Sequence, residues 1–596
     1  MEQLCQILKT GTPQQIANEL ADYYTQYANK PETIANIELK LKVIDVLFDI
    51  LRDQNLINVY PLALQVMRIF TRDSSVSKVA FDDGRIETLL HLAMLVGEEE
   101  ALMTETSQTF DQRIVVEAQK CMSNLLSTSD MVRSICSRNS CIEGIMLRLR
   151  MHPDPKLPSD VKYFDMLMLF LLTAMNHELR DKVQSDYHGL IYLMEAIDLI
   201  LKNNAEYWAE NVNNRSKRRS KGSRRGRKTQ TEHEAPPPPP QPSTMMDTNA
   251  NNSEDRGDDA LVTYCLDDWE VNIAIQVLKV LFNLTISVEN RQLDEIEEAH
   301  FFRLVSILHD LLLCDTKNGN KREELQSQTV NLLTNMPSKS YEELLSKISE
   351  LGRPENPEYE YDEMNMEVIA ALLKFLDKRL DDINANSSNN LEKVAPILIC
   401  LAKASSSQPI IRKYIRYQIL PPLKDIRSRP EDGTTLRNKL VRFMTSPDMH
   451  LKQLTAHLLF VLCKENTSRL IKYTGYGNAA GLLAGRGLLS CINSNSNYSS
   501  DSEESDTEEY VQNIDRINPV TGCIDQPRSG PNPLDHMSEE QKEYEANKLA
   551  CIMDQLHRGG VIQPCKIDKD GRPVPVEHIL ELQKPCHSKQ NESDSE

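Results

Sequence analysis

Apolar residues recur at helical spacing from the start of the chain to about residue 490. They fill segments of roughly 10 to 18 residues that are separated by short polar breaks. Several segments close in the same way, with an aliphatic run that stops at a polar residue. Their sequences are LQVMRIFTRD, AQKCMSNLLS, LKVLFNLTIS, TVNLLTNMPS, PILICLAKAS and LLFVLCKENT. Recurrence at irregular intervals of about 40 to 70 residues is typical of armadillo and HEAT arrays.

Helix pairs of this kind cannot bury their apolar faces alone, so neighbouring pairs stack into a superhelix with a concave groove. The alternative is a compact helical bundle. We predict an all-α fold, an armadillo/HEAT-like helical solenoid, with N-terminal repeats over 1–210 and C-terminal repeats over 261–490.

Two segments interrupt the helical pattern. Residues 211–260 are first basic (KRRSKGSRRGRK), then proline-rich, then polar, which predicts a disordered insert. The basic run also has the composition of a nuclear-import signal or of a contact for anionic membrane, although a solvated loop is the simpler interpretation. Residues 491–535 form an acidic linker that contains NSNSNYSSDSEESDTEEY.

A separate amphipathic helix follows the linker, within a segment predicted at 536–565. Ser538 and Gln541 have the spacing of a capping box at its start. The residues predicted to share its apolar face are Leu549, Ile552, Met553 and Leu556. We expect this face to dock on the array or on a partner, and the tail at 566–596 to be mostly disordered.

The overall charge and the cysteines narrow the function. A formal charge of −20 disfavours general nucleic-acid binding, because phosphate backbones repel such a surface. The 13 cysteines lie singly in apolar segments without a CxxC pair, so we expect reduced thiols in a cytosolic protein and no structural zinc. The start, MEQLCQILKT, lacks the features of a secretory signal, and the longest apolar run, MLMLFLLTAM, is about half the length of a membrane span.

The glycine-rich stretch RLIKYTGYGNAAGLLAGRG raises the question of nucleotide binding. Gly475, Gly477 and Ala480 satisfy the loose spelling of a dinucleotide loop. Such a loop must follow a β-strand, whereas the preceding residues here have helical periodicity. We therefore expect Gly475 and Gly477 to close one helix and Asn478 to cap the next.

Enzymatic chemistry is not indicated. The histidines show no HExxH spacing, and the chain contains neither GxSxG nor GxxxxGK[ST]. We predict no cofactor, no metal and no catalytic side chain.

Four sequence blocks closely resemble the synembryn family, which is named for resistance to inhibitors of cholinesterase. They are YIRYQILPPLKDI, TLRNKLVRFMTS, LLFVLCKENTSRLIKYTGYGNAAGLLAGRGLL and INPVTG. The likeness covers most of the chain and is strongest over 410–490. The insert at 211–260 is longer and more basic than the family leads us to expect, so no property of the family is carried over to it.

The resemblance implies a guanine-nucleotide exchange factor and folding chaperone for heterotrimeric G-protein α subunits, in their GDP-bound or nucleotide-free states. It implies a cytoplasmic, monomeric protein that reaches the cell cortex and inner plasma membrane only through the α subunit. A role in asymmetric cell division belongs to the same expectation. The main alternative is an armadillo-type adaptor or scaffold without exchange activity.

The family grips the C-terminal helix of the α subunit in its groove, and the matching positions here are Arg68, Arg72 and Asn124. A helix C-terminus and its carboxylate are negative, and two arginines at i and i+4 on one helix face can bind them. The alternative is that both arginines are solvated and that Asn124 is a structural asparagine that links helices.

The resemblance also places two activating phosphosites at Ser500 and Ser505. Both have glutamate at +3, as acid-directed casein kinase two substrates do. A phosphate adds charge of roughly −1.5 to −2. We expect cations of TLRNKLVRFM to receive the phosphates, and the candidates are Arg437, Lys439 and Arg442. The alternative is a linker that only increases solubility.

Overall fold

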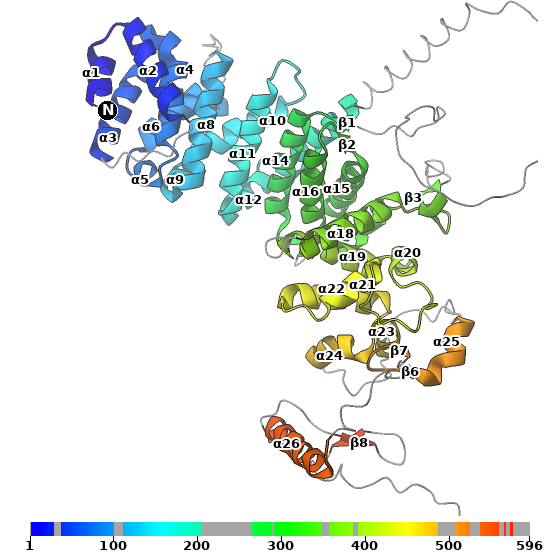
Figure 1. The fold of residues 1–596 in the computed structure, drawn as a ribbon. Coiled ribbons are helices and arrows are strands. Elements are labelled where there is room, and N and C mark those ends of the chain that lie inside the picture. The colour runs from blue at the N-terminus through cyan, green and yellow to red at the C-terminus, as the bar shows by residue number, and fades with distance from the viewer. Residues whose placement is uncertain are drawn as a thin grey trace, which may run out of the picture. The chain divides into compact units, whose positions relative to one another are not determined.

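The recurring aliphatic segments all lie in helices, which confirms the predicted all-α architecture (Figure 1). The computed structural model describes residues 2–28, 37–99, 111–204, 265–288, 291–348, 357–385, 391–486, 507–524, 537–558, 565–567 and 573–575. The predicted insert at 211–260 lies outside these residues. The chain divides into two units, residues 1–415 and 416–596.

The first unit consists largely of consecutive helices. Its helices are α1 (Glu2–Thr10), α2 (Pro13–Tyr27), α3 (Ile37–Arg52), η1 (Gln54–Val59), α4 (Tyr60–Phe70), α5 (Ser74–Ser77), α6 (Asp83–Leu92), α8 (Gln112–Thr128), α9 (Asp130–Arg138), α10 (Cys141–Arg150), α11 (Ser159–Ala174), α12 (His177–Ser185), α14 (Asp268–Thr285), α15 (Glu295–Leu313), α16 (Gly319–Leu333), η3 (Ser338–Leu344), η4 (Pro357–Tyr359), α18 (Glu367–Ala385), η5 (Leu391–Lys393) and α19 (Ala395–Ser407). The next helix, α20 (Pro409–Ile419), crosses the boundary between the units.

One helix of each repeat packs against its counterparts in the neighbouring repeats. These helices, which we call the inner row, are α2, α4, α8, α11, α14, α16 and α19, and each contacts the next along the chain. The other helices form a second layer, in which α3 packs on α4 and α6 packs on α8. Figure 1 shows α11, α14 and α16 of the inner row side by side.

Asparagines link the inner row from one repeat to the preceding one. The Asn124 side chain donates from α8 to the Arg68 carbonyl (3.3 Å) and to Thr71 Oγ1 (3.1 Å). Asn283 makes the same pair of bonds to Phe170 and Thr173. Asn335 makes them to Phe282 and Thr285. Lys403 takes this place in the last rung and donates to the Thr334 carbonyl (2.7 Å).

Arginines close the ends of several inner helices. Arg133, Arg180 and Arg412 each donate to a backbone carbonyl seven residues earlier, at Leu126, Thr173 and Ser405. The last carbonyls of a helix have no partner within the helix, and a cation there also complements the helix dipole. This arrangement explains why several aliphatic segments end in the same way: a polar turn follows each of them before the next helix begins.

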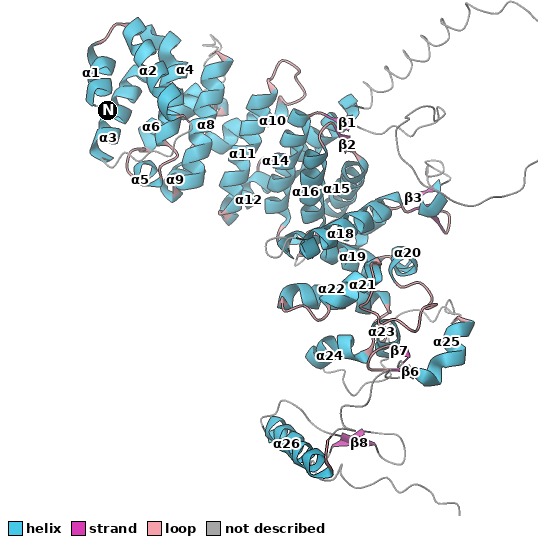
Figure 2. Cartoon of the chain, in the orientation of Figure 1, coloured by secondary structure: helices cyan, strands magenta, loops and turns pink. Residues whose placement is uncertain are grey.

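Strands are short and peripheral (Figure 2). In the first unit β1 (Cys265–Leu266) pairs in parallel with β2 (Asp315–Thr316), and the residues in register are Cys265 with Asp315 and Leu266 with Thr316. Antiparallel β3 (Ser346–Lys347), β5 (Met364–Asn365) and β4 (Glu360–Tyr361) form a three-stranded sheet in that order.

The second unit begins with four packed helices. They are α21 (Leu436–Phe443), α22 (Met449–Leu462), α23 (Thr467–Thr474) and α24 (Tyr476–Gly485). Within the predicted linker, the structure has α25 (Glu508–Asn513), η6 (Ile514–Arg516) and the antiparallel pair β6 (Ile517–Asn518) and β7 (Cys523–Ile524). The predicted amphipathic helix is α26 (Glu539–Arg558), and Ser538 and Gln541 form its capping box. The antiparallel pair of β8 (Cys565–Ile567) and β9 (Pro573–Pro575) lies at the start of the tail that is predicted to be mostly disordered.

The apolar helices are core helices. Among the residues that the structure describes, no helix combines the length and the apolar character that crossing a bilayer requires. The described thiols are free, and most are buried. Burial raises the pKa of Cys400 and of Cys463 to about 12, so both stay protonated.

Candidate partner-binding face

Three cations gather where α4 meets α8, and we call Arg68, Arg72 and Lys120 the cation cluster. The last residues of α2 orient both arginines. Arg68 donates to the Tyr24 hydroxyl (2.5 Å), and its guanidinium lies 5.7 Å from the centre of that ring. Arg72, in the turn after α4 and exposed, donates one bond from Nη1 to the Ala28 carbonyl (2.9 Å). The structure thus brings the two predicted arginines together, although α4 ends at Phe70, before Arg72.

A buried carboxylate lies inside this cluster. Glu117 of α8 is 7% exposed; its Oε1 accepts from Lys120 (2.8 Å), and its Oε2 lies 3.4 Å from Arg68 Nε. Among the residues that the structure describes, neither Glu117 Oε2 nor Arg68 Nε has a hydrogen-bond partner. The contact between them is therefore a long ion pair that leaves two buried polar atoms unsatisfied.

Asn124 is a rung of the inner row, as the structural interpretation predicted. Its two bonds to α4 use both hydrogens of Nδ2. Its Oδ1 accepts no hydrogen bond within the described part of the chain. Asn124 can thus accept a bond from a partner's N–H group while it holds α8 on α4.

Aromatic side chains continue the surface along the inner row. Tyr163, Phe164 and Phe170 of α11 and Phe282 of α14 are half-buried, and Trp269 at the start of α14 is 47% exposed. We call these five residues the aromatic face. The Tyr163 ring lies 5.1 Å from that of Phe164 and 6.2 Å from that of Trp269, centre to centre.

Two lysines of the inner row contact rings of the aromatic face. Lys120 of the cation cluster lies 5.8 Å from the centre of the Phe164 ring, so the cluster and the aromatic face adjoin. Lys279 lies 5.7 Å from the centre of the Phe170 ring. Burial lowers the pKa of Lys279, against the opposing effect of Glu324. The surface is therefore cationic at α4 and α8 and aromatic at α11 and α14.

A buried polar network fixes the helices beneath this surface. Arg148 of α10 holds both oxygens of Asp165 in α11, and Gln119 of α8 donates to the same carboxylate (2.7 Å). Burial raises the pKa of Asp165, which Arg148 opposes. Nearby, burial and then the charges of Lys162 and Arg148 lower the pKa of His152 to about 3.

The glycine-rich stretch does not form a nucleotide loop. It follows helix α23 rather than a strand. The N–H groups of Tyr476 and Gly477, which open α24, donate to the carbonyls of Pro519 and Val520 (both 2.9 Å). Gly475 ends α23 and turns the chain with φ of +74°, as predicted for a helix-closing glycine.

Two predicted details of this stretch were wrong. Gly477 lies inside α24 rather than before it, and Asn478 does not cap the helix. The Asn478 side chain instead donates to Glu431 (2.9 Å) and to the Thr474 carbonyl (2.9 Å). The INPVTG segment supplies the groups that satisfy the helix start, so a cap at Asn478 is not needed.

The three predicted phosphate receivers differ in accessibility. Arg437 donates twice to the Tyr473 carbonyl (3.0 and 3.2 Å), and Lys439 is 5% exposed. Only Arg442 is exposed. Arg437 donates to a carbonyl at the end of a helix, as Arg180 does. Its position beside other cations in the sequence did not reveal this role. Ser500 and Ser505 lie outside the described residues.

The segment after these serines is anchored in the second unit. Thr507 caps α25 and donates its hydroxyl to the Leu423 carbonyl. Tyr510 is buried, and Lys472 lies 4.5 Å from the centre of its ring. Lys472 is thus a cation beside the described end of the acidic segment.

The apolar side of α26 is exposed. Leu549, Ile552 and Met553 are 59%, 46% and 38% exposed, and Tyr544 is 67% exposed. The predicted fourth member, Leu556, belongs to the same helix, but its side chain is outside the described set. None of the three predicted side chains is buried on the array.

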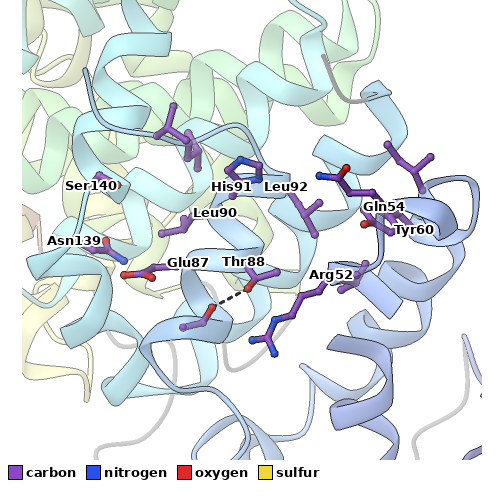
Figure 3. A pocket seen from close by; sticks show the side chains of 15 residues that line it. Arg52, Gln54, Tyr60, Glu87, Thr88, Leu90, His91, Leu92, Asn139 and Ser140 are labelled. Atoms are coloured by element: carbon purple, nitrogen blue, oxygen red, sulfur yellow. Dashed lines mark hydrogen bonds between the residues drawn. The ribbon is translucent and has the colours of Figure 1, made fainter. Parts of the chain in front are cut away.

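A separate pocket of about 920 Å³ lies among α3, η1, α6 and the α9–α10 turn. Figure 3 shows Asn139 and Ser140 on the side of this pocket away from Arg52 and Gln54, with Glu87, Thr88 and His91 of α6 also lining it. Its charges are of both signs, and it includes none of the predicted site residues. Within the described ranges, no group of three histidine, cysteine or carboxylate side chains has a metal-site arrangement.

Sequence reasoning missed Tyr24, Glu117, Lys120 and the aromatic face. Glu117, Lys120 and Asn124 share one face of α8 at spacings of three and four, which is a detectable signal. Phe164 lies just before the apolar run MLMLFLLTAM, and Phe170 lies within it. Tyr24 had no sequence signal, since it meets Arg68 from 44 positions away.

Comparisons with known proteins agree over most of the chain. A family model described as guanine nucleotide exchange factor synembryn matches residues 63–233 and 249–572. The chain is 34% identical to Chaperone Ric-8 of Drosophila pseudoobscura pseudoobscura, over 92% of this chain and 90% of that one. It is 35% identical to Chaperone Ric-8A of Xenopus tropicalis, over 87% and 85%. The corresponding figures for Chaperone Ric-8A of Mus musculus are 34%, 87% and 84%.

Among solved structures, the chain is similar to one from a study of the interaction between cadherin and β-catenin. The TM-score is 0.46 and the identity 14%, over 82% of this chain and 72% of that chain.

Proposed function

Because this chain belongs to the family of the guanine nucleotide exchange factor synembryn, we propose that it is an exchange factor and folding chaperone for heterotrimeric G-protein α subunits. One observation supports the proposal of how it binds them. The inner row presents a cation cluster directly beside an aromatic face, and Lys120 of the cluster contacts the Phe164 ring of that face. A peptide helix that ends in a carboxylate and carries apolar side chains has the complementary chemistry.

Arg72 is the main candidate for the partner's C-terminal carboxylate. Its Nε and Nη2 have no partner among the described residues, whereas Arg68 is held by Tyr24 and Glu117. Guanidinium groups bind carboxylates through two parallel hydrogen bonds. Asn124 would accept a backbone N–H of the partner through Oδ1. The negative end of the partner's helix dipole faces the same cations.

The aromatic face would take the apolar side chains of the same partner helix. Aromatic side chains supply large contact areas at low entropic cost, and each 100 Å² of apolar surface buried contributes about 2.5 kcal/mol. A surface that joins cations and aromatics can therefore bind an amphipathic helix end strongly while it rejects a purely polar one.

Exchange follows from differential binding and needs no nucleotide site on this chain. A protein that binds the empty α subunit more tightly than the GDP-bound form expels GDP by reciprocity. A ratio of 10⁴ in affinity corresponds to about 5.5 kcal/mol. Holding the α subunit's last helix would displace it from its place in the GDP-bound form. The same grip would shelter apolar surface of a nascent α subunit, which makes a chaperone role continuous with exchange.

Two further contacts complete the proposal. The exposed face of α26, with Leu549, Ile552, Met553 and Leu556, would contact the α subunit. Phosphorylation of Ser500 and Ser505 by casein kinase two would place negative charge near Lys472 and the exposed Arg442, rather than at Arg437 or Lys439. We further propose a cytoplasmic monomer without catalytic side chains, which reaches the cell cortex through the α subunit.

The test measures release of a fluorescent GDP analogue from a purified α subunit. The full chain should accelerate release from the intact subunit and not from one without its last helix residues. Arg72→Ala should slow the accelerated release about tenfold, near the loss of one charge-assisted hydrogen bond. The matched control is Arg113→Ala, since Arg113 is an exposed arginine of α8 that pairs with Asp111. Binding without release would instead support the adaptor alternative.

A further inference from the structure

We propose that Glu117 acts as an internal counter-ion, which lowers the positive charge of the cation cluster. A partner's carboxylate alone then gains less binding energy at the cluster, and affinity depends also on the partner's other contacts. This inference rests on the proposed function, because it concerns how the same site recognises the α subunit's C-terminal end. It assigns Glu117 the role of a specificity-determining residue.

The first step is the geometry of the ion pairs. Glu117 bridges two of the three cations, with Oε1 2.8 Å from Lys120 Nζ and Oε2 3.4 Å from Arg68 Nε. Both ion pairs lie within the inner row. The Lys120 pair is internal to α8, and the Arg68 pair joins α8 to α4. Glu117 therefore offsets part of the Arg68 and Lys120 charge from the buried side of the cluster.

The second step is that this pairing is incomplete. At 3.4 Å the Arg68 contact is longer than a charge-assisted hydrogen bond of about 2.8 Å, and both atoms remain unsatisfied and buried. A buried polar atom without a partner is costly. The pairing therefore offsets the Arg68 charge only in part, and Glu117 competes with a partner's carboxylate for the remaining attraction.

The third step concerns the charge that a partner meets. Three cations and one buried carboxylate leave a net charge of about +2 at the cluster, since charges a few ångströms apart interact strongly at low dielectric. Without Glu117 the cluster would attract any anionic chain end. With it, a carboxylate alone gains less, and the contacts on the aromatic face carry more of the discrimination.

The experiment compares two synthetic peptides with the sequence of the last ~15 residues of a G-protein α subunit, one a free acid and one a C-terminal amide. Binding to the full-length chain is measured by titration calorimetry. We expect the wild-type protein to prefer the acid by about threefold. Glu117→Gln keeps the size of the side chain and an acceptor for Lys120, and we expect it to raise the preference for the acid to about twentyfold. The matched control, Glu87→Gln, changes an exposed carboxylate of α6 and should leave the ratio unchanged.

A second variant keeps the inference testable if Glu117→Gln does not fold. Arg68→Gln leaves Glu117 with Lys120 alone and removes one arginine charge, and we expect it to lower the acid-to-amide ratio below that of the wild type, with Arg72 still present as the main carboxylate partner. An unchanged ratio in folded Glu117→Gln, or equal weakening of both peptides, would overturn the inference and make Glu117 a structural residue. If neither peptide binds the wild-type protein, the proposed function fails instead.

Discussion

The glycine stretch around Gly475 and the arginine pair at Arg68 and Arg72 both look like ligand sites in the sequence, yet they differ in what the fold leaves free. At the glycines, the N–H groups that open α24 already donate to Pro519 and Val520. At the arginines, Arg72 bonds to the described part of the chain only through Nη1, and Arg68 is held by a long ion pair. The binding capacity of a motif is therefore what remains after its own chain has used its hydrogen-bonding groups.

The close approach at the glycine junction explains why it is closed to ligands. A Cβ at Gly475 would lie 3.0 Å from the Val520 carbonyl oxygen, and one at Gly522 would lie 3.1 Å from Gly475 Cα. Backbone thus packs on backbone, with no room for a phosphate. Both residues have positive φ, +74° and +71°.

The largest expected effect is at this junction. Gly475→Ala places an alanine at φ +74° and ψ +149°, which side chains other than glycine rarely adopt, and pushes against Val520. We expect a loss of about 3 kcal/mol in the free energy of unfolding. Urea denaturation checks the loss, and amide exchange at Tyr476 and Gly477 should become faster.

Gly485→Ala is the matched control in the same helix, because nothing lies within 4 Å of its added Cβ. A similar loss in both variants would mean that an added methyl group destabilises this segment by a route other than the contact with 519–520. In that case the glycines would not be held closed by the INPVTG segment.

The next largest effect concerns how stability depends on pH, which should differ between the buried network around His152 and the glycine junction. His152 has a pKa of about 3 in the folded state against 6.5 normally. Below pH 6.5 the unfolded chain binds a proton that the folded chain does not, so stability is fully present above pH 6.5 and falls toward pH 3. Between pH 7 and pH 5 we expect a loss of about 2 kcal/mol in the first unit.

This loss should be absent in His152→Gln, measured by urea denaturation at both pH values. Amide protection at Tyr476 and Gly477 should stay unchanged over the same range, because backbone hydrogen bonds make that contact. Equal pH sensitivity in wild type and variant would assign the effect to other groups.

The smallest effect separates the two roles of the inner-row asparagines. Asn124→Ala and Asn335→Ala each remove a side chain that makes two bonds to the preceding helix, and we expect each to cost about 1 kcal/mol. Thermal unfolding measures this. Only Asn124→Ala should also weaken binding of the α-subunit peptide, by a few-fold. Equal affinities in the two variants would restrict Asn124 to its structural role.

Most of the helices could be predicted from the sequence because periodicity is a local property. The segments that end at Thr71, Ser127 and Thr285 all lie in inner-row helices. The helix and strands within the predicted acidic linker could not be predicted in this way. Residues 507–524 have little apolar periodicity, and their structure depends on bonds to distant residues such as Leu423 and Ile426.

The candidate site was only partly predictable for the same reason. Arg68 and Arg72 are visible as neighbours in sequence, but Tyr24 and Glu117, which decide how free Arg68 is, come from other helices. Burial separates Arg442 from Lys439 although they are three residues apart. Spacing shows which residues can share a face, and only packing shows which face is covered.

The rungs of the inner row all point the same way. Asn124, Asn283, Asn335 and Lys403 donate to helices that precede them in the chain, and Arg133, Arg180 and Arg412 donate to carbonyls that were made before them. For these bonds, each repeat that leaves the ribosome therefore finds its acceptors already in place. The array can assemble in the order of its synthesis, one repeat at a time.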